Sequence, residues 1–341
     1  YWSDGIQLSP EQAKVVFDTM SKMDVFEDVK VVSFDQAQEW ITVLDEDFDE
    51  FYMQQVLAQT IRPDVIRQQC DLSIVYTPFH GAGLRLVPEV LARAGFENVH
   101  PVEQQMVPDG TFPTVKSPNP ENKEGFQLAI ELAEKLGSDL IIGTDPDSDR
   151  MGIVVRKSDG EYVAVTGNQT GVILLQYILS SYAQLGSMPK NPLVVKTIVT
   201  SELASRICER YGAQIVNGLT GLKCIGEQIE QCVDTQKNTF VMGYEESYGY
   251  LVGTYARDKD GVVASLLIAE AAAYYRSRGM TLWDALCEIY AEYGYHMEQT
   301  VNLYMEGLDG KEKMKKLMAQ LRDHAPAELG GIAVKEVRDY S

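Results

Sequence analysis

Basic residues are scarce in this sequence. It has 30 lysines and arginines against 50 aspartates and glutamates, which gives a formal net charge of −20. Proteins that bind nucleic acid without regard to sequence need a basic surface that displaces counterions, so this balance argues against a nucleic-acid partner. The negative charge also repels phosphorylated molecules at long range. A phosphate ligand would therefore need a local cationic pocket.

Long apolar runs are missing as well. No stretch reaches the length needed to cross a bilayer, which argues against a membrane partner. The first residues, Tyr1-Trp2-Ser3-Asp4-Gly5, contain no basic patch, apolar stretch or small-residue cleavage site of the kind that marks a signal peptide. We therefore expect a cytoplasmic protein. Nothing in the sequence indicates the oligomeric state.

Paired cysteines are absent. The chain has five cysteines and no Cys-x-x-Cys motif: Cys70, Cys208, Cys224, Cys232 and Cys287. An odd number without such a motif argues against a disulfide framework or a thiolate metal site. Reduced, buried thiols are the better interpretation.

A chain of 341 residues is long enough for two or three compact units. Residues 1–44 have helical periodicity around Pro10–Met23 but form no complete unit. From Leu72 onward, predicted strands and helices alternate with short connections, which is typical of a parallel sheet covered by helices. Past Tyr295 the pattern predicts three further elements: one strand, a charged helix over Lys311–His324 and a last strand over Ile332–Val337.

The alternating part contains two similar runs. The first is predicted to hold helices over Leu84–Ala94 and Asn122–Leu136, each ended by a glycine, and to close with a hairpin over Gly152–Val165. The second repeats the plan, and long helices over Gly261–Arg278 and Leu282–Tyr293 follow it.

Both runs contain an apolar strand, a glycine and an acidic loop in the same order. The two segments are Leu140-Ile141-Ile142-Gly143-Thr144-Asp145 and Phe240-Val241-Met242-Gly243-Tyr244-Glu245. We interpret them as a weak internal repeat. Ligands gather beyond the carboxyl ends of strands in open α/β sheets, so both loops are expected at functional edges.

The first of these loops predicts a metal site. Its sequence is Gly143-Thr144-Asp145-Pro146-Asp147-Ser148-Asp149-Arg150. Alternate side chains of an extended loop share a side, so Asp145, Asp147 and Asp149 can converge on one cation. Three adjacent carboxylates without a cation would repel one another, and a hard ion such as Mg²⁺ resolves that conflict.

Two other kinds of structure share part of this acidic pattern. A calcium EF-hand also opens with Asp-x-Asp-x-Asp, but it needs a glycine next and a glutamate at the twelfth position, where this chain has Arg150 and Arg156. The other possibility is a solvated acidic turn that binds no ion. Arg150 favours a built cluster, because it can balance the acids or contact a substrate phosphate.

The second loop, Gly243-Tyr244-Glu245-Glu246-Ser247-Tyr248-Gly249-Tyr250, is a candidate sugar-binding loop. Glu245 and Ser247 would face the same way and could hydrogen-bond vicinal sugar hydroxyls. A polar turn before a hairpin would explain the pattern equally well.

A cationic group is the third signal. Its members are Lys196, Lys223, Arg257 and Lys259. Lys196 stands in an otherwise apolar strand, where a charge is costly unless it ends at a ligand edge. Thr220 and Gly221 allow a close backbone approach to a ligand. Each lysine taken alone reads more simply as a solvated surface group, but together they outline a phosphate pocket.

His80 and its neighbouring glycines are weaker indications of function. The histidine follows a strand in Pro78-Phe79-His80-Gly81-Ala82-Gly83, where a structural role in the turn is the simpler interpretation. The Gly81-x-Gly83 pair lacks the third glycine and the later acidic residue of a dinucleotide fingerprint, which argues against NAD.

These motifs together resemble the α-D-phosphohexomutase superfamily, and more closely its phosphoglucomutase and phosphomannomutase branch. The resemblance covers nearly the whole chain. It rests on an ordered set of segments: Tyr76–Gly81, Gly143–Arg150, Lys196–Ser201, Thr220–Lys223, Gly243–Ser247 and Arg257–Gly261.

The resemblance implies an α/β fold with two consecutive mixed-sheet α/β/α domains and partial flanking domains. The boundaries expected are residues 1–44 for the tail of domain I, 45–165 for domain II, 166–294 for domain III and 295–341 for the start of domain IV. The family's metal loop matches the three aspartates, and its sugar-specificity loop matches Glu245 and Ser247. Lys196, Arg150 and Lys259 match positions near the substrate's phosphate or the reacting hydroxyl, and Arg150 and Lys259 are the catalytic candidates. The other expected substrate-binding residues are Thr220, Gly221, Lys223 and Arg257.

The family's reaction implies Mg²⁺, hexose phosphates as substrates and glucose 1,6-bisphosphate as activator. A phosphoserine gives its phosphate to the sugar, and the resulting bisphosphate turns round and returns the other phosphate. No Ser-His-Asn segment of the phosphoserine kind occurs, and no Arg-Pro-Ser-Gly-Thr phosphate loop follows Ser341. We therefore expect a chain truncated at both ends and inactive alone. Some family members have a histidine after the sugar-specificity loop as the candidate general base. Here Tyr248 and Tyr250 occupy that neighbourhood, so Lys259 is the predicted general base.

Two other functions remain open from the residues. A metal-dependent phosphatase with an aspartate nucleophile would use a similar acidic loop with water as acceptor, and an acidic metal-binding scaffold would need no substrate at all. Neither explains the lysines and the Glu-x-Ser loop together. A preference among glucose, mannose and pentose substrates cannot be read from the sequence.

Overall fold

The computed structural model of the chain describes residues 1–299, 303–305 and 307–340. Residues 1–296 and 297–341 group into two compact units. The second unit contains α12 (Gly307–Asp323) and a short antiparallel pair, β10 (Glu328–Leu329) and β11 (Ile332–Ala333). The strand expected after Tyr295 falls on a stretch that includes 300–302 and 306, which lie outside the described residues.

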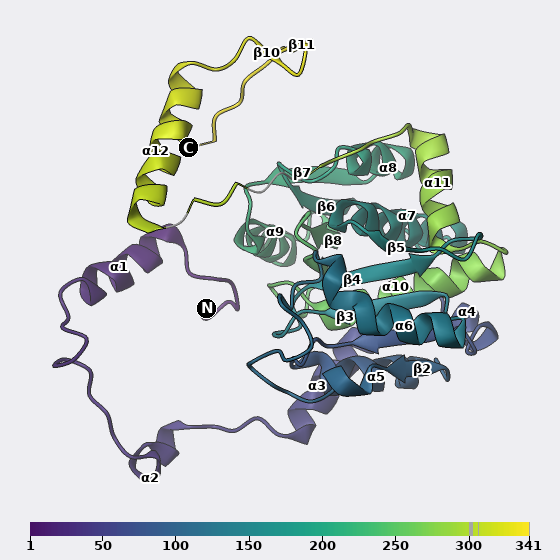
Figure 1. Cartoon of the computed structure of the whole chain (residues 1–341), viewed down its shortest axis with the longest axis horizontal. Helices are drawn as coiled ribbons and strands as arrows, with labels where there is room; N and C mark the ends of the chain where they lie inside the picture. The colour runs from purple at the N-terminus through teal and green to yellow at the C-terminus, as the bar shows by residue number, and fades with distance from the viewer. Residues whose placement is uncertain (300–302, 306, 341) are drawn as a thin grey trace. The chain divides into compact units, whose positions relative to one another are not determined.

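The first sheet has five strands in the order β2-β1-β3-β4-β5 (Figure 1). They are β1 (Ile74–Thr77), β2 (Val99–Pro101), β3 (Leu140–Thr144), β4 (Met151–Arg156) and β5 (Tyr162–Val165). β1 pairs in parallel with β2 and β3, whereas β4 runs antiparallel to β3 and β5. The hairpin predicted over Gly152–Val165 is therefore confirmed.

Helices cover both faces of this sheet. Ile74 and Tyr76 of β1 share a core with α5 (Gly83–Ala94), while Val75 between them packs with α6 (Gln127–Leu136). This is the expected result of side chains that alternate along a strand. Gly95 and Gly137 end the two helices at φ values of 113° and 68°, so the predicted left-handed caps are present.

The second sheet has four strands in the order β7-β6-β8-β9. They are β6 (Pro192–Thr197), β7 (Gln214–Gly218), β8 (Thr239–Tyr244) and β9 (Tyr250–Val252). Leu193 and Val195 of β6 pack with α9 (Leu222–Thr235), and Val194 joins the core formed with α7 (Gly167–Leu185) and α8 (Leu203–Tyr211).

The two sheets repeat one topology. In each, the first strand lies between the second and third strands in parallel, and a fourth strand is added antiparallel to the third. The acidic loop links β3 to β4, and the Glu245 loop links β8 to β9. The internal repeat predicted from the sequence thus extends to strand order. The two loops occupy equivalent places.

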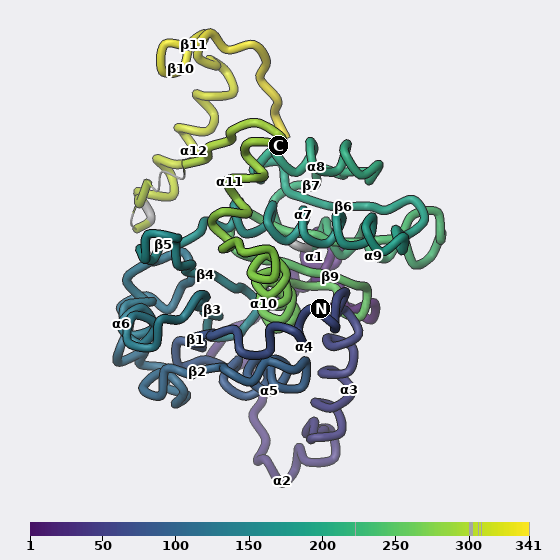
Figure 2. The backbone as a smooth tube through the Cα atoms, turned by 90° about the vertical axis from the view of Figure 1, so that its right-hand side faces the viewer, coloured from purple at the N-terminus to yellow at the C-terminus, as the bar shows by residue number. Residues whose placement is uncertain are grey.

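A buried helix, α10 (Gly261–Ser277), contacts elements of both halves of the first unit. It packs against α5, α7, β9 and α11 (Leu282–Tyr293). Figure 2 looks nearly along its axis and shows the elements of the two sheets on either side. α3 (Glu46–Leu57) and α4 (Pro63–Gln68) also pack on it. The sequence pattern predicts no helix at α3 or α4.

The remaining elements are short. Residues 1–44 hold α1 (Pro10–Met20), which ends earlier than the predicted Met23, and α2 (Phe34–Ala37). The described residues also include three 3₁₀ helices: η1 (Gln38–Trp40), η2 (Glu103–Gln105) and η3 (Lys123–Phe126). Among the residues that the structure describes, no helix combines the length and apolar character that a membrane span requires.

Candidate functional site

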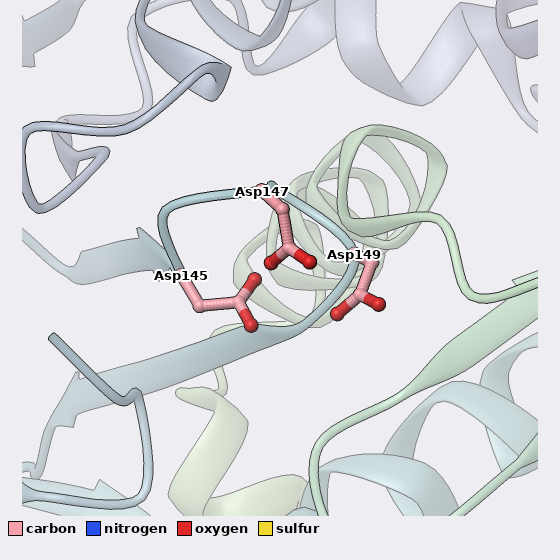
Figure 3. A group of neighbouring side chains, drawn as sticks. All are labelled: Asp145, Asp147 and Asp149. Carbon is pink, nitrogen blue, oxygen red and sulfur yellow. The ribbon is translucent and has the colours of Figure 1, made fainter. Parts of the chain in front are cut away.

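The acidic loop, Asp145–Arg150, follows β3 and brings its three aspartates together. Carboxylate oxygens of Asp145, Asp147 and Asp149 all lie within 4.8 Å of one another. Figure 3 shows the three side chains grouped around one loop turn. Ser148 has a φ of 60°, and this left-handed residue turns the chain between the second and third aspartates. The convergence predicted from the alternating spacing is present.

Asp145 is the buried member of the group. Its two oxygens accept from the backbone N–H of Arg150 at 2.9 Å and from the Nε of Arg150 at 2.7 Å. Burial raises the pKa of Asp145 to about 6, and the charge of Asp149 adds to that shift, although the bonds from Arg150 oppose it. A carboxyl group that is hard to ionise in this setting would be stabilised in its charged form by a cation.

Lys259 reaches the loop from the segment before α10. Its Nζ lies 2.8 Å from Asp149 Oδ2 and 3.2 Å from Asp258 Oδ1. Burial alone would lower the pKa of Lys259, but the hydrogen bond and charge of Asp149 outweigh it and the pKa is raised. A raised pKa favours the charged ammonium, which does not favour the general-base role predicted for Lys259.

A cavity of about 360 Å³ adjoins this group. Asp147, Asp149, Arg257 and Lys259 are among the residues that line it, together with Gly83. Arg257 is also held by Glu230, whose Oε2 lies 2.9 Å from Nη2. The cavity therefore combines acidic and basic side chains, as a site for a metal ion and a phosphate requires.

The turn that contains His80 packs directly on the acidic loop. Ala82 N–H donates to Pro146 O at 2.7 Å. A Cβ added to Gly81 would come within 2.3 Å of Pro146 Cα, so only glycine allows this approach. The His80 ring nitrogens lie 2.9 Å from Val107 O and from Thr114 Oγ1. These contacts fit the structural role expected for this histidine.

The Glu245 loop, Glu245–Gly249, is joined to the acidic loop through the backbone. Arg150 and Gly249 form an antiparallel bridge, and Met151 N–H donates to Tyr248 O at 3.0 Å. Two loops that lie nearly a hundred residues apart in the sequence thus form one edge. Spatial proximity of this kind was implied by the resemblance alone.

Glu245 is buried in this edge and binds a third segment. Its Oε1 accepts from Gly221 N–H at 2.8 Å, which places Thr220 and Gly221 beside it. Gly221 has a φ of 106°, a conformation that favours glycine. Burial raises the pKa of Glu245. Ser247, in the same loop, is half-buried.

Lys196 and Lys223 do not line the cavity beside the aspartates. Lys196 is fully buried, and its Nζ lies 3.1 Å from Thr200 O and 2.9 Å from Glu202 Oε1. Lys223 lies 3.7 Å from Glu227 on α9. The structure therefore groups Asp147, Asp149, Arg257 and Lys259 around one cavity, and Asp145 and Arg150 belong to the adjoining loop without lining it. It places these two lysines on the second sheet's side.

Several residues of the site are missed by sequence reasoning. Glu246 accepts from the hydroxyls of Thr197 and Thr200 at 2.9 and 3.2 Å, which ties the Glu245 loop to the end of β6. Glu121 lies 3.4 Å from Nη1 of Arg150. Both contacts join segments distant in sequence, so no local spacing could have revealed them. The acidic doublet Glu245-Glu246 was the one available signal.

Comparisons with known proteins agree with this geometry. Residues 50–160 match the model for phosphoglucomutase/phosphomannomutase α/β/α domain II, and residues 166–293 match that for domain III. A phosphoglucomutase of Staphylococcus haemolyticus is 38% identical over 80% of this chain and 48% of its own length. One of Staphylococcus aureus strain MRSA252 is 34% identical over 100% of this chain and 60% of its own length.

A solved structure shows the same fold. A phosphoglucomutase/phosphomannomutase family protein from Burkholderia thailandensis superposes with a TM-score of 0.56 at 17% identity, covering 82% of this chain and 54% of that one. The chain spans about half to three-fifths of the length of these relatives. The mixed-sheet α/β fold expected from the sequence is confirmed. The chain belongs to the α-D-phosphohexomutase superfamily.

Proposed function

We propose that the protein is a phosphohexomutase of the phosphoglucomutase/phosphomannomutase type, an isomerase that moves phosphate between two hydroxyls of a hexose phosphate. The junction of the acidic loop and the Glu245 loop is the observation that carries this proposal. It places three converging carboxylates beside a loop whose side chains suit sugar hydroxyls. The activity named for the staphylococcal relatives supports the same reaction.

The donor set of the acidic loop fits Mg²⁺. Asp145, Asp147 and Asp149 offer only carboxylate oxygens, which are the ligands that this hard ion prefers. We propose that these three residues hold the ion. When bound, Mg²⁺ supplies positive charge that neutralises phosphoryl oxygens during transfer.

The chain's own residues have distinct proposed roles around this centre. Arg150 and Lys259 contribute positive charge beside the aspartates, close to where a transferring phosphate would lie. Glu245 and Ser247 bind sugar hydroxyls and orient the ring. Arg257, which lines the cavity, is proposed to bind a substrate phosphate, and Thr220, Gly221 and Lys223 are proposed as further substrate-binding residues. Lys196 is fully buried and bound to Glu202, so it has no direct contact with substrate in this arrangement.

The proposed reaction needs a phosphoserine that carries the phosphate. In this reaction a phosphoserine donates to the sugar, and glucose 1,6-bisphosphate both activates the enzyme and turns round in the site. The 341 residues contain no Ser-His-Asn segment. We therefore propose that these residues alone bind metal but do not turn over.

Transfer of labelled phosphate tests the function. The protein as its gene encodes it is incubated with Mg²⁺, a trace of glucose 1,6-bisphosphate and ³²P-labelled glucose 1-phosphate, with mannose 1-phosphate in a parallel reaction. We expect the label to appear in the 6-phosphate of one sugar. Label released as inorganic phosphate would indicate a phosphatase instead. Unchanged substrate in both reactions, with no hexose-phosphate binding by calorimetry, would indicate a scaffold.

A further inference from the structure

Asp260 is a buried acid that binds groups from three segments. Its oxygens lie 2.9 and 2.8 Å from the hydroxyl of Tyr52 on α3, and 2.6 Å from the hydroxyl of Tyr255. The same carboxyl group caps α10 by accepting from the backbone N–H groups of Val262 and Val263 at 2.8 and 3.1 Å. Only 6% of the residue is exposed. Such a fully bonded acid fixes its surroundings.

The capped end of α10 contacts the acidic loop at its turn. Gly261 N–H, in the first residue of the helix, donates to Ser148 O at 3.0 Å. A Cβ added to Gly261 would lie 2.6 Å from that oxygen and 3.1 Å from Arg150 O. The helix end and the loop backbone are therefore in direct contact. The positive end of the helix dipole therefore lies against the backbone of the acidic loop.

The turn at Ser148 needs such support. A residue with a side chain is strained in the left-handed conformation that Ser148 adopts at a φ of 60°. Its hydroxyl is buried with no hydrogen-bond partner among the described residues, so the side chain does not stabilise the turn. The backbone does so through two bonds, Ser148 N–H to Asp145 O at 2.9 Å and Gly261 N–H to Ser148 O.

Both tyrosines are protonated donors in this network. Burial and the neighbouring charge of Asp260 raise the pKa of Tyr52 and of Tyr255 above the ordinary range. Neither hydroxyl contacts an aspartate of the acidic loop. Their influence on the metal site therefore has to pass through Asp260 and the first turn of α10.

We propose that Asp260, held by the hydroxyls of Tyr52 and Tyr255, is a positioning residue for the metal site. It fixes the N-terminus of α10, whose Gly261 N–H holds the Ser148 turn in the shape that makes Asp147 and Asp149 converge. The inference rests on the proposed function, because it assumes that the acidic loop binds a divalent ion. It adds residues from α3 and from the loop before α10 to that site.

The chain offers a matched control on the same helix. Tyr177 donates its hydroxyl to Glu270 Oε1 at 2.7 Å, so it is also a buried tyrosine bound to a buried acid of α10. Glu270 lies about two and a half turns away from Gly261. Tyr177→Phe removes one buried hydroxyl from an acid of the same helix but leaves the Ser148 turn alone, and thermal unfolding records how the cost in stability compares with that of the double variant.

Mn²⁺ binding measured by electron paramagnetic resonance tests the inference. The protein as its gene encodes it is titrated with Mn²⁺ as wild type, as the Y52F/Y255F double variant and as Y177F, with thermal unfolding recorded for each. Loss of an outer partner of a metal ligand commonly costs about 10–100-fold in affinity. Because the two hydroxyls act further from the ion than a direct partner does, we expect a smaller loss of about two- to tenfold for Y52F/Y255F and an unchanged dissociation constant for Y177F.

The outcomes separate the inference from the proposed function. If wild type binds Mn²⁺ and Y52F/Y255F binds it equally well, or if Y177F weakens binding as much as the double variant, the positioning role is wrong. If wild type does not bind Mn²⁺ at all, the proposed metal centre is wrong and the positioning role falls with it.

Discussion

Met151 donates its backbone N–H to the carbonyl oxygen of Tyr248 at 3.0 Å. The first residue belongs to β4, just after the acidic loop, and the second belongs to the Glu245 loop between β8 and β9. The contact therefore joins equivalent loops of two repeated sheets. Because the bond is between backbone groups, side-chain substitutions in either loop leave it in place. The effect of such a substitution on activity can therefore be attributed to the side chain that was changed.

Replacing Asp147 by Asn should weaken Mg²⁺ binding. The change keeps the shape of the side chain but removes the charge of one of the three proposed metal ligands. Losing the charge of a direct ligand should weaken Mg²⁺ binding by more than the roughly tenfold that the loss of a residue bonded to a ligand costs at the least. Calorimetric titration measures it. Asp159→Asn is the control, because Asp159 lies in the turn between β4 and β5 and bonds the N–H of Glu161 there. Equal affinities for wild type and Asp147→Asn would contradict the assignment.

Replacing Glu245 by Ala should lower kcat/KM for hexose phosphates. A hydrogen bond to a charged group contributes about 1.5–3 kcal/mol, which corresponds to a loss of roughly 10–100-fold. Steady-state kinetics with glucose 1-phosphate in the protein as its gene encodes it provides the measurement. The exposed Glu209, which lies 3.7 Å from Arg206 on α8, supplies the control variant Glu209→Ala. A Glu245→Ala enzyme with unchanged kcat/KM would rule out its role in binding the sugar.

Replacing Gly261 by Ala should destabilise the fold. The new Cβ would lie 2.6 Å from Ser148 O, a backbone atom that cannot swing away. Overpacking of this kind typically costs about 1–3 kcal/mol in the free energy of unfolding. Urea denaturation measures the change. Gly110→Ala has open space around it and should have little effect, so equal stabilities for the two variants would show that the contact is not tight.

Glu270 predicts a pH dependence of stability. Burial raises its pKa above the ordinary value of 4.5, although Tyr177 and the backbone N–H groups of Arg62 and Ile61 oppose the shift. The folded state therefore holds a proton that the unfolded state releases. Its contribution to stability is fully present below pH 4.5 and is lost as the pH rises through the folded pKa.

The substitution Glu270→Gln isolates this contribution. The free energy of unfolding of wild type should fall more steeply than that of the variant as the pH rises above about 4.5. Urea titrations at a series of pH values measure both slopes. Parallel curves for wild type and Glu270→Gln would show that this carboxyl group titrates alike in the folded and unfolded states.

Local patterns predicted the elements well where one signal dominated. The helix over Leu282–Tyr293 matches α11 at both ends, because Thr281 caps it by accepting from Asp284 N–H and Gly294 follows it. The three aspartates converge as their spacing indicates. α3 has a mixed pattern and little buried surface, so its helix depends on packing against α5 and α10.

Long-range partners could not be predicted in the same way. Glu246 belongs to an acidic doublet in the sequence, but only the fold shows that it accepts from the hydroxyls of Thr197 and Thr200, more than forty residues away. Asp260 reads as an ordinary helix cap until Tyr52 is found beside it, more than two hundred residues away in sequence. The contact between Tyr52 and Asp260 is set by the packing of α3 on α10, which no local period encodes.

A crystal structure of the protein as its gene encodes it, with Mn²⁺ and a hexose bisphosphate, tests the central claim most directly. Mn²⁺ stands in for Mg²⁺ and identifies itself by anomalous scattering. The account predicts one strong anomalous peak bonded to oxygens of Asp145, Asp147 and Asp149, with the sugar hydroxyls bound by Glu245 and Ser247 and a phosphate beside the ion. A peak elsewhere, or a sugar bound away from both loops, would contradict it.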